Sequence, residues 1–376
     1  MGSTSLTLLI GPAVPVPAPA AVIEALTGVS VSHDATRSGF QLSFAVSKTS
    51  TLLTTLLPAG YFDPIVTRIV VIATAGGVPN VLMDGIVTQQ QLQPSSEPGG
   101  STLTITGEDL SVAMDVASLT RPFPAMDETA IVNLILLPYL ALGIVPVVIP
   151  PIVPILEAPT AGWNTQTNQT DRAYIRQLAD RCGYVFFVRP GPLPLQSVAY
   201  FGPDVDVPVP QPALTINMDA HTNVESLSFT LNGLAKKIRV FTIFDPVTKK
   251  VPIPIPLPNI NAFKPPLGLR PTPPARIEFD EESANLTPDK AARNILGFLL
   301  DRNNAAAVTG SGSLDVLRYG RSLAPRMLVG VRGAGIAYDG LYYVDSVSHD
   351  LKRGSYKQNF TLSRDGLIAN VPVLPV

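Results

Sequence analysis

Few residues in this chain of 376 have the type and spacing that catalysis or metal binding requires. There are three histidines: His33 and His349 each lie in a Val-Ser-His-Asp phrase at a predicted strand end, and His221 lies in a predicted loop. Neither Cys nor Glu accompanies them at metal-ligand spacing, so the sequence predicts no metal site. We expect instead that Asp34 and Asp350 accept hydrogen bonds from the local backbone in a turn.

The other candidates for chemistry are equally weak. A serine beside His-Asp suggests a catalytic triad, but a triad is a spatial arrangement, and the chain has no Gly-x-Ser-x-Gly elbow. The acidic residues Glu278, Asp280, Glu281 and Glu282 could supply paired carboxylates for glycoside hydrolysis, although their place beside a predicted insertion favours a solvated loop. The glycines within 310–312 and 330–335 predict turns rather than a phosphate site. We therefore predict no catalytic residue and no cofactor.

Composition narrows the classes of function further. Only 15% of the residues are charged and the net charge is −2, which argues against nucleic-acid binding and suggests a surface covered by partners. The single cysteine, Cys182, predicts a small core residue rather than a nucleophile or a disulfide. Residues 1–12 lack the basic region of a secretory signal. Residues 130–156 are uncharged, but their five prolines argue against a membrane span.

One stretch, residues 169–188, predicts a capped helix followed at once by a strand. Thr170 or Asp171 can cap the helix N-terminus, and Gly183 suits the left-handed residue that ends a helix. An apolar face recurs between them at helical spacing, formed by Tyr174, Ile175, Leu178, Ala179 and Cys182. The aromatic and β-branched run that follows predicts a buried strand.

Two sets of alternating segments predict antiparallel strands in the same order. The first set is residues 29–33, 40–46, 65–73, 81–92 and 101–106, and the second is 224–231, 237–244, 327–333, 340–349 and 356–363. In each set a hairpin comes first, an Asp-Gly turn follows the third strand (Asp84-Gly85 and Asp339-Gly340), and an acidic turn with Leu closes the set. This self-similarity predicts an internal duplication.

We therefore predict an α+β, mainly β fold with two similar small antiparallel β-barrels and an α+β module that lies between them and is inserted into the second. The predicted parts are an N-terminal arm (1–28), a first barrel (29–112), an α+β module with Pro-rich insertions (113–222 and 246–312), a second barrel (223–245 and 313–370) and a tail (371–376).

Two proline-aliphatic segments, residues 145–159 and 251–258, fit no standard element, because alternating prolines should block strand pairing and hold the chain extended. Each is either a stiff surface loop or an apolar arm laid on a neighbouring subunit.

Three phrases resemble the phage tail hub family, which includes late-control D proteins, the T4 baseplate hub and the hub portion of VgrG spikes. The first is the helix–strand phrase at 170–188. The second is Asp-Gly-Leu-Tyr-Tyr-Val-Asp-Ser-Val-Ser-His at 339–349, and the third is Tyr-x-x-x-Phe-Thr-Leu-Ser-Arg at 356–364. The residues that match the family phrases are Thr170, Asp171, Tyr174, Leu178, Ala179, Gly183, Asp339, Gly340, Tyr342, Val344, His349, Tyr356, Phe360 and Arg364.

The resemblance implies a structural role without chemistry. The resemblance implies a trimer with two tube-like barrels per chain. Six barrels would then surround a channel and adapt a three-fold spike to a six-fold inner tube. The implied partners are two further copies, the hexameric tube protein and neighbouring baseplate subunits, assembled in the cytoplasm into a phage tail or contractile injection particle. Unlike VgrG, the chain ends after the last predicted barrel strand, so we expect a separate spike protein.

Two other classes of function stay open at this point. A β-rich glycan hydrolase of a tail or cell wall is the main alternative, and it would need two carboxylates in one cleft. A membrane-associated pore component is the third. The sequence does not distinguish a phage from a secretion system or an extracellular injection device.

Overall fold

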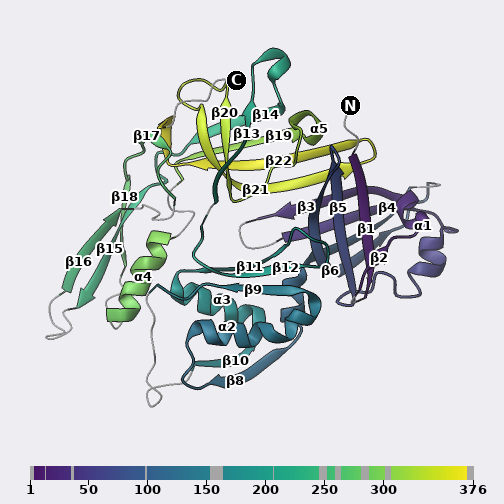
Figure 1. Ribbon diagram of the computed structural model, residues 1–376, viewed down its shortest axis with the longest axis horizontal. Coiled ribbons are helices and arrows are strands. Elements are labelled where there is room, and N and C mark those ends of the chain that lie inside the picture. Colours follow the sequence, from purple (N-terminus) through teal and green to yellow (C-terminus); the bar gives the residue numbers. More distant parts are fainter. Residues whose placement is uncertain are drawn as a thin grey trace.

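The computed structural model describes residues 4–12, 14–34, 38–97, 100–152, 164–205, 207–244, 252–258, 264–280, 288–300 and 306–370. Most of the strands form one 13-stranded sheet, seen across the top and right of Figure 1. Its strands are β1 (Thr4–Pro12), β2 (Val16–Pro17), β3 (Leu26–His33), β4 (Ser38–Val46), β5 (Thr67–Ala75), β6 (Val78–Gln93), β7 (Ser101–Asp109), β13 (Val207–Thr215), β14 (Val224–Leu231), β19 (Val308–Asp315), β20 (Met327–Arg332), β21 (Gly340–Lys352) and β22 (Ser355–Arg364).

The sheet consists of two halves with the same strand order. The first half runs β5-β6-β7-β4-β3 and the second runs β20-β21-β22-β19-β14, all pairs being antiparallel. The halves are joined where β3 pairs with β21. The two halves differ in the strand that follows next to β5 and to β20. β1 pairs with β5 in antiparallel fashion, whereas β13 pairs with β20 in parallel fashion.

Single-residue bulges occur at matching places in the two halves. Thr27 is the extra residue of β3 opposite β4, and Glu225 is the extra residue of β14 opposite β19. In the same way Thr88 bulges from β6 opposite β7, and Asp345 from β21 opposite β22. A bulge bends a strand at a fixed point in its register. Strand order and bulge positions together support the predicted duplication.

The structure corrects three expectations about these strands. The described strands form an open sheet and close no barrel, since the path from β14 to β2 has two free ends. The predicted N-terminal arm, residues 1–28, contains β1, which pairs with β5 over nine residues, as well as the short helix α1 (Ala20–Ala25). The pairing is favourable because alternate residues of β1, among them Leu8 and Ile10, are buried in the core.

The predicted hairpin at 224–244 is also wrong. Its first strand, β14, pairs with β19, which begins at Val308. Its second strand, β15 (Lys237–Phe244), forms a separate sheet with β16 (Pro252–Pro258) and β18 (Arg276–Asp280), seen at the left of Figure 1. The insertion therefore begins at Asn232, directly after β14, and not at Pro246.

Glycines also occupy places that the sequence analysis assigned to turns. Asp84-Gly85 lies inside β6, and Gly310 and Gly312 lie inside β19. Aromatic rings explain two of these glycines: a Cβ on Gly310 would lie 2.8 Å from Phe229, and one on Gly312 would lie 2.7 Å from Phe360. Asp339-Gly340 does precede a strand at a turn, with φ of +117° at Gly340.

An α+β module lies beneath the large sheet in the view of Figure 1. It contains β8 (Ser118–Phe123), α2 (Glu128–Leu136), the 3₁₀ helix η3 (Leu137–Leu142), β9 (Ile144–Val148), β10 (Asn164–Thr170), α3 (Asp171–Cys182), β11 (Val185–Pro190) and β12 (Ser197–Gly202). Its core is continuous with residues of the inserted helix α4 (Pro288–Leu300), including Leu300. The remaining elements are η1 (Leu52–Leu56), η2 (Leu110–Asp115), η4 (Asp219–His221), β17 (Gly268–Pro271), α5 (Val316–Tyr319) and β23 (Gly366–Ala369).

The expectation that alternating prolines block strand pairing is wrong. β16, with the sequence Pro-Ile-Pro-Ile-Pro-Leu-Pro, pairs with β15 over seven residues, and β9 pairs with β12. Both proline-bearing strands lie at sheet edges. An edge strand needs donors on one side only, so a proline at every second position can turn its nitrogen outward while the residues between keep their amides for pairing. Residues 153–163 of the first proline-aliphatic segment lie outside the described residues.

Candidate assembly surface

A polar trough of about 630 Å³ crosses the second half of the sheet. Along a strand every second side chain points to the same face of the sheet. Small polar side chains from five strands line the trough in this way: Ser32, Ser226, Ser228, Ser311, Ser313, Ser346, Ser348, Asn359 and Thr361. Several of these hydroxyls bond across adjacent strands, with oxygen–oxygen distances of 2.8 Å for Ser226 and Ser313 and 2.7 Å for Ser346 and Thr361. His33 and Asp34 also line the trough, and its other lining side chains are uncharged.

The C-terminal phrase residues come together beneath the opposite face of the same strands. Arg364, at the end of β22, is 1% exposed and donates hydrogen bonds to the carbonyl oxygens of Gly366 at 2.7 Å, Ala337 at 2.8 Å and Asp339 at 2.9 Å. Its guanidinium also lies over the ring of Tyr342. Val344 and Phe360 belong to the same buried core. The phrase therefore encodes the packing of two strand ends.

The histidine phrases are placed differently from the prediction. His349 lies inside β21, not in a turn, and its Nδ1 is 2.8 Å from the Tyr356 hydroxyl and 3.2 Å from Nε2 of Gln358. His33 ends β3, and its ring meets that of His349 edge to face at 5.7 Å between centroids. Burial lowers the pKa of His33 to about 4, and burial together with His33 lowers the pKa of His349 to about 3. Both imidazoles are therefore neutral at pH 7.

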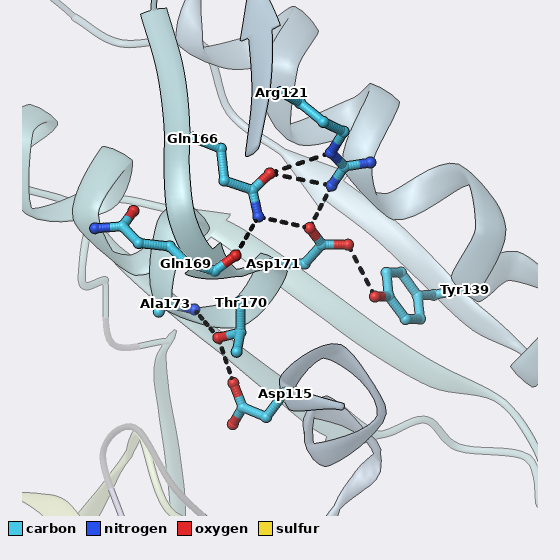
Figure 2. A network of polar contacts seen from close by, with 8 residues as sticks. All are labelled: Asp115, Arg121, Tyr139, Gln166, Gln169, Thr170, Asp171 and Ala173. Atoms are coloured by element: carbon cyan, nitrogen blue, oxygen red, sulfur yellow. Dashed lines mark hydrogen bonds and ion pairs between the residues drawn. The ribbon is translucent and has the colours of Figure 1, made fainter. Parts of the chain in front are cut away.

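The N-terminus of α3 is fixed by a polar network that joins it to η2, β8, η3 and β10 (Figure 2). Thr170 is the cap: its Oγ1 accepts from the Ala173 amide at 3.2 Å and donates to Asp115 at 2.8 Å. Asp171 is not the cap but an anchor. Its carboxylate accepts from the Tyr139 hydroxyl at 2.9 Å and from Arg121.

Gln166 completes this network. Its amide nitrogen donates to Asp171 at 2.9 Å and to the carbonyl oxygen of Gln169 at 2.8 Å, and its oxygen accepts from Arg121 (Figure 2). Burial, and then the hydrogen bond to Asp171, raise the pKa of Tyr139. Thr170, Asp171 and Gln166 all bond to groups of the protein, so the network holds the helix in place.

The predicted apolar face of α3 is the core of the module, since Tyr174, Leu178, Ala179 and Cys182 are all buried in it. Burial raises the pKa of the Cys182 thiol to about 12, so the thiolate is absent at neutral pH. Gly183 ends the helix with φ of +66°, and a Cβ there would lie 2.3 Å from the Cα of Gly297 in α4. Two helices thus meet backbone to backbone at this glycine.

Buried ion pairs are the main feature that the sequence analysis missed. Arg68 of β5 donates two hydrogen bonds of 2.6 Å to Asp84 of β6, and Ser197 of the module donates to the same carboxylate at 3.3 Å. Arg326 pairs with Asp204, and Arg293 of α4 pairs with Glu128 of α2. A single charge in each of two neighbouring apolar strands was the available signal for the first pair.

The candidate catalytic carboxylates have structural partners as well. Glu278 and Asp280 lie on β18, not in a loop, beside Lys237 and Arg239 of β15, and the hydrogen bond from Lys237 lowers the pKa of Glu278. Glu281 and Glu282 lie outside the described residues. Within the described ranges, no three His, Cys, Asp or Glu residues are grouped as metal ligands. Also within those ranges, no helix is long and apolar enough to cross a membrane.

Comparisons with known proteins agree with this architecture. No protein-family model and no curated protein matches the sequence. A tail protein from Neisseria meningitidis MC58 matches in structure with a TM-score of 0.60 at 13% identity, over 97% of this chain and 98% of that one. The 43 kDa tail protein of prophage MuSo2 from Shewanella oneidensis has a TM-score of 0.60 at 12% identity, over 97% and 100%.

A third structure comes from a secretion system. The E. coli c3393 protein, a component of the type VI secretion system with structural similarity to T4 bacteriophage tail proteins, has a TM-score of 0.51 at 11% identity, over 93% of this chain and 76% of that one. At identities this low, these structural matches show a shared fold alone. The chain therefore has the fold of phage tail proteins and of this secretion-system component, the fold expected for the hub family that its sequence phrases resemble.

Proposed function

We propose that this chain is the structural hub of a contractile tail or injection system, in which three copies form a pseudo-six-fold ring between a three-fold central spike and a six-fold inner tube. It acts through shape and symmetry and is not an enzyme. Its partners are two further copies, a separate spike protein, the hexameric tube protein and neighbouring baseplate subunits. Assembly takes place in the cytoplasm, and the product is a phage tail or a contractile injection particle.

The observation that carries this proposal is the repeated half-sheet. Both halves have the order found for β5-β6-β7-β4-β3, and both carry bulges at the same two places, Thr27 with Thr88 and Glu225 with Asp345. A ring of three chains with one such half each would have three similar units, whereas two halves per chain give six. A six-fold partner can then meet six similar surfaces while a three-fold partner meets three identical chains.

The polar face of the sheet supports a channel lining. Residues directly opposite one another on paired strands have side chains on the same face of the sheet. In the first half, Ser43 lies opposite Thr104 and Thr104 opposite Gln91, so these side chains continue the polar face of the trough. These side chains are uncharged, and none is buried. Such a face stays hydrated and binds passing chains weakly, which suits the inside of a tube.

The polar networks support a structural role in another way. Strongly shifted groups in a catalytic site usually lie in an open cleft. Here the shifted histidines and the capped end of α3 have partners that position strands and helices. His33 is the one of these groups that lines the trough, and its ring contacts His349 and Ser38.

The test is the native mass of the chain, measured by light scattering alone and then with a candidate central spike protein from the same genome. We expect a mass of about 120 kDa, from three copies of 39.9 kDa, and a ring in negative stain. A monomer that also stays monomeric with the spike contradicts the proposal. A separate assay of glycan hydrolysis addresses the alternative, and turnover that is abolished by one Asp→Asn or Glu→Gln change would support it.

A further inference from the structure

The joint between the two halves of the sheet occupies one free edge from each half. On β21, the first residues pair with β20 and the last residues, Val347 to Lys352, pair with β3. The partners on β3 are Gly28 to His33, so the joint contains six residue pairs. The joint therefore uses the C-terminal part of β21, a strand inside the second half, and the outer edge of β3, the last strand of the first half.

Each half also has the equivalent of the edge that the other half uses in this joint. These two equivalent edges have no partner in the described sheet. In the first half, β5 pairs with β6 only as far as Ile86, and the segment Gln89 to Gln93 pairs with β7 alone. In the second half, the row-end strand β14 pairs with β19 alone. Among the described strands, each of these edges is open on the side that corresponds to the β3–β21 joint.

We propose that β14 of one copy pairs with residues 89–93 of β6 in the next copy, repeating the internal joint between chains. This inference rests on the proposed function, since a ring is what the repeated joint would close. The occupant of both edges is a second copy of this chain, because that copy carries the complementary edge in the required register. One chain then offers each neighbour a different edge, a head-to-tail contact that closes into a ring.

The bulges fix the register of this joint. In the internal joint the second residue after the Asp345 bulge, Val347, lies opposite the sixth residue after the Thr27 bulge, His33. Counting in the same way from Thr88 and from Glu225 places Gln90 opposite Leu231. Since the strands are antiparallel, the next pairs are Gln91 with Thr230, Leu92 with Phe229, and Gln93 with Ser228.

The side chains of the two edges suit this pairing. Leu92 and Phe229 take the places of His349 and Val31, which are buried in the internal joint, whereas Leu92 is 44% exposed in the single chain. Thr230 and Gln91 take the places of Ser32 and Ser348 on the polar face. Residues 89–93 and 226–231 contain no charged residue and no proline. Exposed edges usually carry such residues to prevent pairing, and their absence favours a sheet edge that is used.

A disulfide test reports this register directly. The variant Thr230→Cys with Gln91→Cys places two thiols opposite each other across the proposed joint, where strand spacing allows a disulfide. The matched control is Thr230→Cys with Gln93→Cys, which keeps both thiols on the same face but displaces them by two residues. Each single substitution serves as a second control, and buried Cys182 stays unreactive.

After mild copper-catalysed oxidation we expect covalent dimers and trimers, with none larger, from Thr230→Cys/Gln91→Cys, in at least ten-fold higher yield than from the displaced pair. Ser228→Cys with Gln93→Cys should behave like the first pair, which guards against a variant that fails to fold. A three-copy native mass without these disulfides overturns the joint and leaves the hub proposal standing. A monomeric mass with and without the spike protein overturns both.

Discussion

The guanidinium of Arg364 lies over the ring of Tyr342, with the Arg Cζ atom 4.4 Å from the ring centroid. The same group donates to three carbonyl oxygens in the turns that flank β21 and β22. A planar fork of five donors is needed to stack on a ring and serve several acceptors at once. One side chain thus fixes the ends of two strands that lie next to the proposed channel face.

Replacing this side chain by lysine should destabilise the chain. Arg364→Lys keeps the charge but loses at least two of the three hydrogen bonds inside a buried site, and the expected loss is about 3 kcal/mol in the free energy of unfolding. Urea unfolding followed by circular dichroism measures it. The exposed control Arg318→Lys should change stability by less than about 0.5 kcal/mol. Equal effects for the two variants would show that the buried contacts of Arg364 contribute nothing.

The ion pair between Arg68 and Asp84 predicts a non-additive pair of mutations. Asp84→Asn leaves the buried Arg68 guanidinium without its counter-charge, which costs about 3–5 kcal/mol. The double variant Arg68→Met/Asp84→Asn removes both charges and should lose less than the single variant Asp84→Asn. Urea unfolding of the wild type and the three variants of this cycle, with Arg68→Met as the third, gives the coupling energy. A double variant less stable than Asp84→Asn would contradict this account.

The contact between Gly183 and Gly297 separates backbone strain from packing. Gly354 has a similar φ, +75° against +66°, but a Cβ on it meets nothing within 4 Å. Gly354→Ala should therefore cost about 1 kcal/mol for the left-handed conformation alone. Gly183→Ala must in addition push α3 from α4, and its cost should exceed that of Gly354→Ala by at least about 1 kcal/mol. Thermal melts of both variants test this, and equal costs would mean that the two helices can separate freely.

The buried histidines predict a loss of stability in mild acid. The pKa values of His33 and His349, about 4 and about 3, lie below the unfolded value of 6.5. Between these values the two imidazoles are protonated in the unfolded chain and neutral in the folded chain. Their contribution is complete above pH 6.5 and decreases as the pH falls toward 4. At pH 5 the expected loss is about 2 kcal/mol for each histidine.

Urea unfolding at pH 7 and pH 5 measures this loss. His349→Gln should reduce the pH dependence by about half, whereas His221→Gln, at an exposed position, should leave it unchanged. Stability that is the same at both pH values in the wild type would show that the two imidazoles are not buried as described.

Local signals predicted α3 and its surroundings well. The cap at Thr170, the left-handed Gly183 and the apolar face with Leu178 all depend on neighbours within four residues, and the structure has each of them. Alternation, a local pattern, also predicted β3 to β7 of the first half and β14, β20, β21 and β22 of the second, but not β19. The family roles of the phrase residues stay a prediction, although most of them are now placed in two buried clusters.

Long-range pairing could not be predicted. A turn at Asn232-Gly233 favours a hairpin, yet β14 pairs with a strand that begins at Val308, because the intervening residues form a sheet of their own. The joint between β3 and β21 and the ion pair of Arg68 with Asp84 likewise connect distant segments. The prediction that alternating prolines block strand pairing was wrong for the same reason. Their effect depends on whether the strand lies at a sheet edge, which is a property of the long-range pairing.

Native mass of the chain, alone and with a candidate spike protein from the same genome, tests the central claim most directly. The account predicts about 120 kDa for the chain alone or on the spike, as three copies of 39.9 kDa, and a ring with six similar lobes in negative-stain averages. A chain of about 40 kDa under both conditions would contradict the ring, its six half-sheets and the edge pairing that closes it.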